Sequence, residues 1–565
     1  MLQKQWILRD IDHHQALSLG KALSISPITA TVLLGRGVVG LEQARRWLSP
    51  SDLSGHDPFL LPDMERVVDR IHRAILKGER ICCYGDYDVD GISAVSLFLK
   101  FFRQFGAHVV VYIPDRHKEG YGLNEGAVRK LAADGVTVLV TADCGTTSHA
   151  EIDLAGRLGM DVIVIDHHQI QGRDLGALAL VNPQRVDSQY PFPGLCSGGL
   201  AYKVAQAYAM KFGDCEVPVE SFRDFVALAS IADMVPLQDE NRFLVHDGLI
   251  RMTEGTRCGI RALKQCVGVE GVCTASTVGF RLAPVINAAG RLAHAKAGVR
   301  LLTTESEQEA LGLARELELL NNQRRDIEQG IFEEAKDLVE RAGEPSAIVV
   351  GAQGWHMGVV GIVASRLVER YHRPSVVIAF DGQGVGRGSV RSVPGLDVCE
   401  VLEQCRDFLE GFGGHPAAAG LTIREDRLLE FQEKFVGLVN GVTKPGMRVP
   451  VLEVDAHVSL TDIHLDLLHE LNRLHPFGMG NPEPTFVVKG LRVLEKKTVG
   501  HDHLKLVVRQ NGSVPFESIG FRMGSLAQTV VSTSQPIDLA FIPELNRWRG
   551  LDRVQLRIRD LKVSQ

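Results

Sequence analysis

RICCYGDYDVDG, at residues 80–91, is the stretch of sequence that decides the fold, because an apolar run opens it and a series of acids closes it. VTVLVTADCG at residues 136–145 and VIVIDHH at residues 162–168 repeat this pattern, and HVVVYI at residues 108–113 is a further apolar run. Such runs, rich in β-branched residues and almost uninterrupted, are typical of central strands that are covered on both faces.

Helix-length amphipathic segments separate these runs and predict parallel β-α-β units. The segments are Ile92–Phe105, Glu125–Ala133 and His149–Leu158. In an open parallel sheet the carboxyl ends of the strands lie along one edge, where ligands bind. We therefore expect side chains that are distant in sequence to converge at that edge: Asp86, Asp88, Asp90, Asp143, Asp166, His167 and His168.

This set of side chains predicts a metal centre. Five carboxylates and two imidazoles at one edge would repel one another unless protons or cations neutralised them. Oxygen and imidazole ligands suit Mn²⁺ or Mg²⁺ better than thiolate-seeking metals. Two divalent ions held roughly 3.5–4 Å apart can activate a bridging water and neutralise the attacking and leaving oxygens of a phosphoryl group. The residues therefore favour hydrolysis of a phosphodiester.

Each motif also has a structural interpretation, because an acid after a strand is often only a helix cap or a turn former. The triplet Asp166-His167-His168 is a weak signal alone, since Asp12-His13-His14 repeats it in a segment where we expect no preceding strand. We expect that first copy to lie at the surface. Three successive strand ends with acids are much harder to explain structurally.

Bulk properties set the limits for the rest. The chain has 565 residues, 45% of them hydrophobic and 23% charged, enough for several cores. Its net charge of -7 means that any nucleic acid must follow a local basic groove. The ten cysteines include no C-x-x-C pair, which favours reduced thiols without structural zinc. With neither a signal-peptide pattern nor an apolar run long enough to span a membrane, we expect a cytoplasmic protein.

Further organisation follows from the second half of the chain. Residues 305–341 lack proline and have helical apolar spacing, which predicts a long connecting helix. Apolar runs at 347–350 and 375–380 flank a predicted helix at 359–371 and indicate a second α/β domain. Short alternating runs beyond residue 446 favour a small β-barrel.

The motifs together resemble those of the DHH phosphoesterase superfamily. DYDVDG, TADCG, VIDHH and ASIADMVPL match its four signatures in order, and GFGGHPAAAG at 411–420 resembles the companion DHHA1 domain. Within the superfamily, INAAGRL at 286–292, GWHMGVVGIVASRLVERYHRP at 354–374 and SVRSVPGLD at 389–397 are similar to the RecJ family of single-strand-specific exonucleases. NPEPTF at 481–486 is similar to the OB-fold domain of that family.

The resemblance implies a role for each residue of the centre. Asp88 and Asp90 would be metal ligands, and Asp143 would bridge both ions. His167 and Asp233 would complete the shell of one ion, and Asp86 would serve the other. By the same resemblance His168 would contact the scissile phosphate and Asp166 would orient the two histidines.

Two positions depart from the family pattern. Tyr84 stands where some members have a histidine ligand, which puts the shell of the first ion in question. Cys144 stands where asparagine is commoner, and a thiol beside a hard-metal site suggests sensitivity to oxidation.

The resemblance also implies residues that handle the substrate. Arginine is suited to clamping phosphates because its guanidinium makes paired hydrogen bonds, although any of these arginines could be an ordinary surface residue. Phe477, Phe486 and Phe521 could stack on bases, but core packing is the favoured interpretation. The residues implied to bind DNA or phosphate are Arg116, Tyr121, Asn287, Arg291, His356, Ser389, Arg391 and His415, the last of which could also be a turn histidine.

The sequence therefore predicts an α/β protein with a parallel-sheet DHH domain, a long connecting helix, a second α/β DHHA1 domain and a C-terminal OB-fold barrel. The expected boundaries are an N-terminal segment packing on the DHH domain at 1–63, then DHH at 64–300, the helix at 301–343, DHHA1 at 344–445 and the barrel at 446–565. We expect a 5′→3′ exonuclease that degrades single-stranded DNA to mononucleotides with two Mn²⁺ or Mg²⁺ ions, in DNA repair and recombination.

Two alternatives remain at this stage. One is a nanoRNase or cyclic-dinucleotide phosphodiesterase, which shares the DHH and DHHA1 domains but needs neither the long helix nor a barrel. The other is a non-catalytic DHH relative that only binds DNA or replication partners, which missing ligands would mark. We expect a monomer that acts on single-stranded DNA away from membranes, with a single-strand-binding protein and a helicase as candidate partners.

Overall fold

The computed structural model describes residues 4–50, 55–116, 118–170, 175–213, 216–343, 345–443, 445–500, 502–529, 535–548 and 551–564. The chain forms two compact units. The DHH unit comprises residues 38–322 and 473–483, and the companion unit comprises residues 1–37, 323–472 and 484–565.

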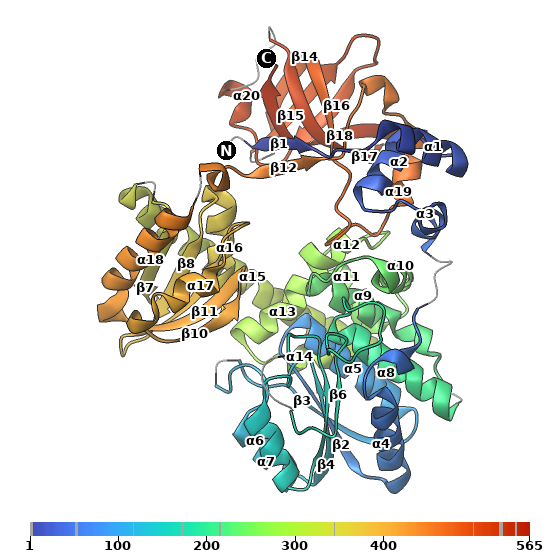
Figure 1. Cartoon of the computed structure of the whole chain (residues 1–565), viewed down its shortest axis with the longest axis vertical. Coiled ribbons are helices and arrows are strands. Elements are labelled where there is room, and N and C mark those ends of the chain that lie inside the picture. Colours follow the sequence, from blue (N-terminus) through green and yellow to red (C-terminus); the bar gives the residue numbers. More distant parts are fainter. Residues whose placement is uncertain are drawn as a thin grey trace. The chain divides into compact units, whose positions relative to one another are not determined.

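A five-stranded parallel sheet of order β3-β2-β4-β5-β6 is the centre of the DHH unit (Figure 1). Four of its strands lie within one or two residues of the predicted runs, and the short β6 was not predicted. The strands are β2 (Arg80–Gly85), β3 (His108–Tyr112), β4 (Val136–Ala142), β5 (Asp161–Ile165) and β6 (Ala179–Val181).

Both faces of this sheet are buried, as the apolar runs predicted. Val138 and Val140 of β4 pack in the larger hydrophobic core, whereas Leu139 between them packs in a second core on the opposite face. Helices α6 (Glu125–Ala133) and α7 (His149–Arg157) cover the second core (Figure 1). The larger core is covered by α4 (Met64–Lys77), α5 (Val89–Arg103) and α8 (Ser197–Phe212).

The turn between β2 and α5 leaves no room for a side chain at Gly91. Asp88 caps α5 by accepting hydrogen bonds from the backbone N–H groups of Asp90, at 2.9 Å, and Gly91, at 3.1 Å. A Cβ atom on Gly91 would lie 2.6 Å from the backbone nitrogen of Asp86, so only glycine allows the helix to begin this close to the strand.

The remaining helices of the DHH unit, apart from α3, contribute to the larger core. Asp233 caps the C-terminal end of α9, so this acid comes from a helix end and not from a strand end. The helices are α3 (Leu41–Leu48), α9 (Arg223–Ala232), α10 (Asp239–Glu254), α11 (Cys258–Cys266), α12 (Ala275–Thr277), α13 (Ala283–Leu292) and α14 (Lys296–Thr303).

Residues 473–483 join the DHH unit although we assigned them by sequence to the C-terminal domain. The buried Arg242 guanidinium donates to the carbonyl oxygens of Leu474, at 2.9 Å, and Arg473, at 3.1 Å. It also donates to the carbonyl of Trp47, at 2.9 Å, and lies 4.9 Å from the Trp47 ring centre. Burial lowers the pKa of Arg242 to about 9.

The companion unit contains the second α/β domain. The predicted connecting helix is α15 (Glu307–Ala342), whose first part belongs to the DHH unit. A mixed sheet of order β10-β11-β9-β8-β7 follows, with α16 (Val360–Tyr371), α17 (Val398–Glu403) and α18 (Leu428–Val442). Its strands are β7 (Ile348–Gln353), β8 (Ser375–Phe380), β9 (Val385–Arg391), β10 (Leu409–His415) and β11 (Ala418–Arg424).

The C-terminal strands form the predicted barrel, which closes because β14 pairs with both β15 and β17. Phe486 and Phe541, which face each other across β14 and β17, are fully buried inside it. The helices and strands of the C-terminal region are β12 (Val451–Val454), which lies outside the barrel sheet, β13 (Ala456–His457), α19 (Leu465–Asn472), β14 (Phe486–Val499), β15 (His503–Arg509), β16 (Phe516–Gly520), α20 (Leu526–Thr529), β17 (Ile537–Trp548) and β18 (Leu551–Val563).

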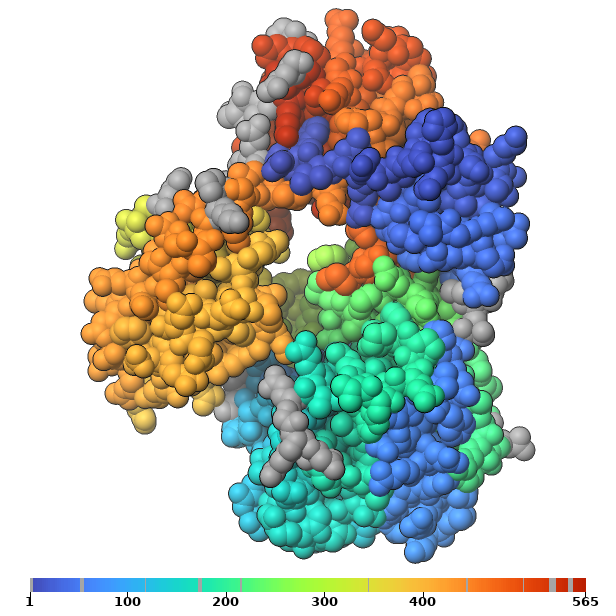
Figure 2. Space-filling view, viewed as in Figure 1, coloured from blue at the N-terminus to red at the C-terminus, as the bar shows by residue number. Residues whose placement is uncertain are grey.

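The N-terminal segment, predicted at 1–63 to pack on the DHH domain, is divided between the units: residues 38–63 belong to the DHH unit, whereas residues 1–37 belong to the companion unit. Strand β1 (Gln5–Leu8) pairs in parallel with β12, and Figure 2 shows the dark-blue N-terminal residues lying against orange residues of the companion unit. The expectation that no strand precedes Asp12 is therefore wrong. Asp12 nevertheless serves as a helix cap, since it accepts from His14 N at 2.8 Å at the start of α1 (His13–Leu23).

Among the described residues, no single helix has both the length and the apolar composition to cross a membrane. Helices α1 and α2 (Pro27–Gly35) meet that test only as a pair, with a bend of 115° between them.

Candidate metal centre

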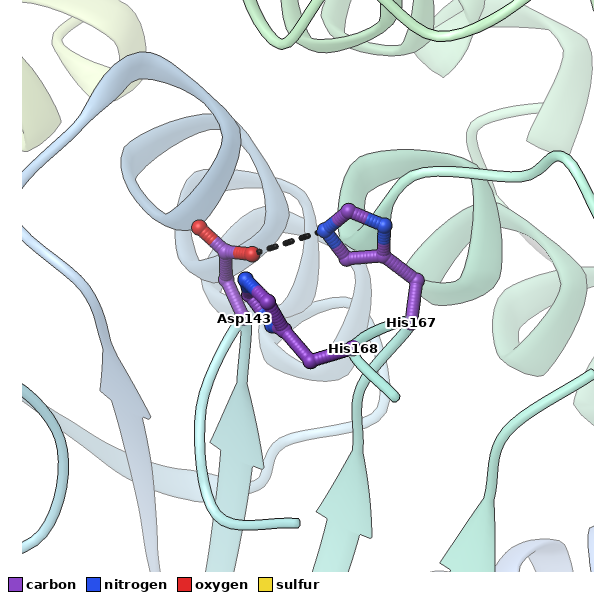
Figure 3. A group of neighbouring side chains, drawn as sticks. All are labelled: Asp143, His167 and His168. Carbon is purple, nitrogen blue, oxygen red and sulfur yellow. Dashed lines mark ion pairs between the residues drawn. The ribbon is translucent and has the colours of Figure 1, made fainter. Parts of the chain in front are cut away.

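The candidate centre lies at the carboxyl edge of the DHH sheet. Figure 3 shows Asp143 beyond the end of β4 and His167 and His168 beyond the end of β5, with the Asp143 carboxylate directed at His167. The acids and histidines form three overlapping groups in which the candidate ligand atoms all lie within 4.8 Å of one another. The groups are Asp86–Asp88–Asp143, Asp90–His167–Asp233 and Asp143–His167–His168.

The first group is built by the turns after β2 and β4. Asp143 adopts a left-handed backbone with φ of 67°, an uncommon conformation for a residue with a side chain. Asp86 is 3% exposed, and its Oδ1 atom has no hydrogen-bond partner among the described residues. A buried carboxylate oxygen without a donor is costly unless a cation binds it, so this group fits a metal ion.

The second group surrounds the Nε2 atom of His167. This atom lies 3.6 Å from Asp233 Oδ2 and 3.8 Å from Asp90 Oδ2, and 3.3 Å from Asp143 Oδ1 of the first group. It is buried, and within the described part of the chain nothing hydrogen-bonds to it. A lone pair surrounded by carboxylate oxygens is the arrangement that a divalent cation would complete.

The start of α8 fixes the carboxylate of Asp90. Asp90 accepts hydrogen bonds from the backbone N–H groups of Ser197, at 2.8 Å, and Gly198, at 2.7 Å. The hydroxyl of Ser197 also donates to Asp143 Oδ1, at 3.2 Å. A Cβ atom on Gly198 would lie 2.5 Å from the Cβ of Ala229, so glycine is needed for this close approach. Sequence reasoning missed both residues, although CSGG at 196–199, at the first turn of a helix, is a detectable signal.

The acids of the centre have raised pKa values. Burial, reinforced by the charges of neighbouring acids, raises the pKa of Asp86 and Asp143 well above the usual range. Burial also raises the pKa of Asp90, and burial together with Asp90 raises the pKa of Asp233 to about 8. Acids that are held together against their mutual repulsion need positive charge, which divalent cations supply.

The two histidines are in opposite electrostatic states. Burial lowers the pKa of His167, so its ring is neutral near pH 7 and its nitrogen is available as a ligand. Burial opposes a charge on His168 too, but the hydrogen bond to Asp166 and the charge of that acid raise its pKa to about 9. A protonated imidazole is a poor metal ligand and a good phosphate contact.

Asp166 holds this part of the chain together. Its Oδ1 atom accepts from His168 Nδ1 at 2.7 Å and from the backbone N–H of His167 at 2.8 Å. Its Oδ2 atom accepts from the backbone N–H of Thr146 at 3.1 Å. Although burial opposes it, the bond from His168 lowers the pKa of Asp166 to about 2. Thr146 was not predicted, because nothing in the sequence links it to residue 166.

Three family models match the chain in the order of its domains. The DHH family N-terminal domain matches residues 80–230, the DHHA1 domain matches residues 344–441, and the RecJ OB domain matches residues 454–560. A Bacillus subtilis (strain 168) protein named single-stranded-DNA-specific exonuclease RecJ is 37% identical over 566 residues, covering 99% of this chain and 71% of that protein. The chain belongs to the RecJ family.

Other members of the RecJ family agree. An Escherichia coli (strain K12) protein of the same name is 34% identical, with 94% of this chain and 95% of that protein covered. The crystal structure of RecJ in complex with Mn²⁺ from Thermus thermophilus has a TM-score of 0.86 at 28% identity, covering 99% of this chain and 80% of that chain. The predicted fold and family are confirmed, and the groups of acids and histidines are placed to hold the Mn²⁺ or Mg²⁺ that RecJ structures contain.

Four of the predicted substrate residues belong to the DHH unit. The Arg116 guanidinium lies 4.9 Å from the ring centre of Tyr87, and the hydroxyl of Tyr121 donates to the carbonyl oxygen of Asp143 at 3.0 Å. Asn287 Oδ1 accepts from the backbone N–H of Val89 at 3.1 Å, which ties α13 to the turn after β2. Arg291 lies one turn further along α13.

The other four belong to the companion unit. Ser389 and Arg391 lie on β9, where Arg391 Nη1 donates to Ser389 Oγ at 2.7 Å. His356 precedes α16, and its Nδ1 accepts from the backbone N–H of Gly358 at 3.0 Å. His415 ends β10 with its side chain exposed. Their roles toward DNA remain predictions.

The two departures from the RecJ pattern have structural explanations. Tyr84 is fully buried in the core beneath α6 and α7, and its hydroxyl donates to the carbonyl of Gly122 at 2.8 Å. Cys144 is 1% exposed, and burial raises the pKa of its thiol well above the usual value. Because the thiolate is the reactive form, this burial and raised pKa argue against an oxidation-sensitive Cys144.

The three phenylalanines also have different positions. Phe486 is fully buried in the barrel core, as the favoured interpretation had it. Phe521 is 53% exposed and meets His503 edge-on at 5.3 Å between ring centres. Phe477 is half-buried beside His475, within the residues that join the DHH unit.

Proposed function

We propose that this chain is a metal-dependent 5′→3′ exonuclease that hydrolyses single-stranded DNA to mononucleotides. Family membership supports the activity and the substrate, because the RecJ relatives that cover nearly all of this chain are named single-stranded-DNA-specific exonucleases. The observation that carries the proposal is the unpartnered Nε2 atom of His167 among the carboxylates of Asp90, Asp143 and Asp233. The polarity and the product rest on the family resemblance.

The chain's own residues divide into two ligand sets. Asp86, Asp88 and Asp143 would hold one ion, and Asp90, His167 and Asp233 would hold the other, with Asp143 between the two sets. When bound, two divalent ions supply an activated water and charge neutralisation for both oxygens of an in-line displacement at phosphorus. The buried groups around them are fixed by backbone N–H donors, so little reorganisation is needed when the substrate arrives.

The residues next to these ligands would handle the phosphate. The protonated His168, held by Asp166, would donate to a non-bridging oxygen of the scissile phosphate. Arg116 and Arg291 would clamp phosphates of the strand. His356, Ser389, Arg391 and His415 of the companion unit would contribute further contacts to the DNA backbone.

Two alternatives are weaker. A nanoRNase or cyclic-dinucleotide phosphodiesterase requires neither the 36-residue α15 nor a barrel, and this chain has both. A non-catalytic DHH relative would lack ligands, but every expected acid and histidine is present and converges at the sheet edge. Further proposals rest on the family alone: a role in DNA repair and recombination, a cytoplasmic location, a monomeric state, and assistance from a single-strand-binding protein and a helicase.

Substrate choice tests the proposal. Single-stranded DNA, duplex DNA and a cyclic dinucleotide are incubated with the protein and Mn²⁺ or Mg²⁺, and each strand is labelled at either its 5′ or its 3′ end. We expect degradation of the single strand only, with the 5′ label released as a mononucleotide at the earliest times and the 3′ label retained on long fragments. No degradation of single-stranded DNA refutes the proposal, and early release of the 3′ label refutes the polarity.

A further inference from the structure

A chain of hydrogen bonds, buried at Tyr84 and part-buried beyond it, lies next to the metal centre. The Tyr84 hydroxyl, which is fully buried, donates to the Gly122 carbonyl at 2.8 Å and accepts from Asn124 Nδ2 at 3.3 Å. The same amide lies 3.4 Å from Glu119 Oε1, which also accepts from the Tyr112 hydroxyl at 2.6 Å. The rings of Tyr84 and Tyr112 stack at 5.2 Å. None of these residues is among the predicted ligands or substrate contacts.

The hydrogen bonds of this network end on one segment, Pro114–Asn124, of which residues 114–116 and 118–124 are described. Glu119 Oε2 accepts from the backbone N–H of Asp115 at 2.7 Å, next to Arg116. Tyr84 holds the carbonyl of Gly122, next to Tyr121. The network therefore fixes the backbone on either side of the two residues that are predicted to meet the substrate.

Those two residues face the centre. The Tyr121 hydroxyl donates to the carbonyl of Asp143 at 3.0 Å, and its ring meets His168 edge-on with 6.1 Å between centres. The Tyr121 and Tyr87 rings meet at 6.5 Å, and Arg116 lies over Tyr87. Tyr121 is nevertheless 53% exposed, so its side chain is accessible to a substrate.

We propose that Tyr84 is a positioning residue for the substrate, acting through Tyr121 and Arg116. This inference rests on the proposed function and names what the tyrosine at this position does in place of a metal ligand. A phenylalanine would fill the same buried space, so the hydroxyl is explained by what it binds. Without it, the Gly122 carbonyl and one Asn124 N–H lose a buried partner, and the segment relaxes. A segment that binds a substrate loses affinity for it when the residues that hold the segment in position are removed.

The test compares Tyr84→Phe with Tyr190→Phe, a matched control in the same unit. Tyr190 is also a buried tyrosine, and its hydroxyl donates to Glu240 outside the metal centre. Binding of a 5′-phosphorylated tetranucleotide is measured by fluorescence anisotropy in EDTA, so that hydrolysis does not interfere. We expect the Kd to rise about tenfold in Tyr84→Phe, the effect of about 1.4 kcal/mol, and to stay unchanged in Tyr190→Phe.

A double-mutant comparison separates positioning from general stability. If Tyr84 acts through Tyr121, then adding Tyr84→Phe to Tyr121→Phe raises the Kd by less than it does in the wild type. With Mn²⁺, Tyr84→Phe should raise the KM for single-stranded DNA about tenfold and change kcat less than twofold. An unchanged Kd, equal weakening in Tyr190→Phe, or full additivity with Tyr121→Phe overturns the inference. Failure of the proposed function is a different result: no hydrolysis by the wild type in Mn²⁺, whatever the Kd values are.

Discussion

Replacing Asp166 by asparagine removes one negative charge and leaves a side chain of the same shape. In the wild type Asp166 keeps His168 protonated, with a pKa of about 9 compared with an ordinary value of 6.5. The hydrogen bond to Asp166 and the charge of that acid are the largest causes of the raised pKa, ahead of the charges of Asp233 and Asp90, and burial opposes all of them. In Asp166→Asn the pKa of His168 should therefore fall from about 9 toward its ordinary value, so that a smaller fraction of His168 is protonated at pH 7.5.

The energy of this pair follows from its buried partner. Asp166 is 1% exposed, and its pKa is lowered from 3.8 to about 2, which corresponds to about 2 kcal/mol. His168 has a 37% exposed side chain, so water screens part of its larger shift and we take the smaller value. The asparagine amide would also face the N–H of Thr146, donor against donor, which costs about 1–3 kcal/mol.

The assay is NMR of metal-free protein carrying ring-labelled histidine, with His168→Gln used to assign the resonance. We expect His168 to titrate near pH 9 in the wild type and at a clearly lower pH in Asp166→Asn. At pH 7.5 with Mn²⁺, kcat/KM for single-stranded DNA should fall about 10- to 100-fold in the variant, the usual effect of losing a residue that orients an active-site histidine. A His168 pKa that stays near 9 in Asp166→Asn refutes the reasoning.

Three further predictions use calorimetry. Metal-free Asp143→Asn should unfold at a higher temperature than the metal-free wild type at pH 7, because the raised pKa of Asp143 means that a negative charge at this buried position destabilises the fold. Mn²⁺ should raise the unfolding midpoint of the wild type only. A lower midpoint in the metal-free variant contradicts this prediction. Arg242→Met should lower the midpoint, since it leaves the carbonyl oxygens of Trp47, Arg473 and Leu474 without this donor at about 1–3 kcal/mol for each buried acceptor, and an unchanged midpoint would exclude the structural role of Arg242. Burial lowers the pKa of His475 to about 4. As pH falls from 6.5 toward 4, the unfolded chain therefore takes up a proton at His475 that the folded chain does not, and this destabilises the fold. The unfolding midpoint of the wild type should fall more steeply over that range than that of His475→Gln, and equal slopes would disprove the prediction.

The part of the fold that the sequence could predict is the part governed by local patterns. The runs at β2, β4 and β5 are buried on both faces, and the run at β3, which is an edge strand, is partly buried; such strands have a clear apolar signal. Strand β6 escaped prediction because three residues, Ala179–Val181, do not make a recognisable run. Register and order in a parallel sheet then bring the acids to one edge without further information.

What escaped prediction depends on contacts between distant segments. No sequence pattern in residues 473–483 indicates that they join the DHH unit. Arg242 binds them by donating hydrogen bonds to backbone carbonyl oxygens, which every sequence has. The pairing of β1 with β12 could not be predicted for the same reason, because it joins two segments that are distant in sequence through backbone hydrogen bonds. In the centre itself, Ser197 and Gly198 bind Asp90 through their backbone N–H groups, which any residue offers, so only the local CSGG pattern could have indicated them.

The central claim is that two ions, one held by each ligand set with Asp143 between the two sets, are required for hydrolysis of single-stranded DNA. Its most direct test is to titrate metal-free wild type and Asp143→Ala with Mn²⁺ by electron paramagnetic resonance, and to measure hydrolysis in the same samples. We predict two spin-coupled Mn²⁺ ions per wild-type chain, hydrolysis that follows the two-ion form, and neither coupling nor hydrolysis in the folded variant. Hydrolysis by a chain holding a single ion, or retained turnover in Asp143→Ala, would contradict the account.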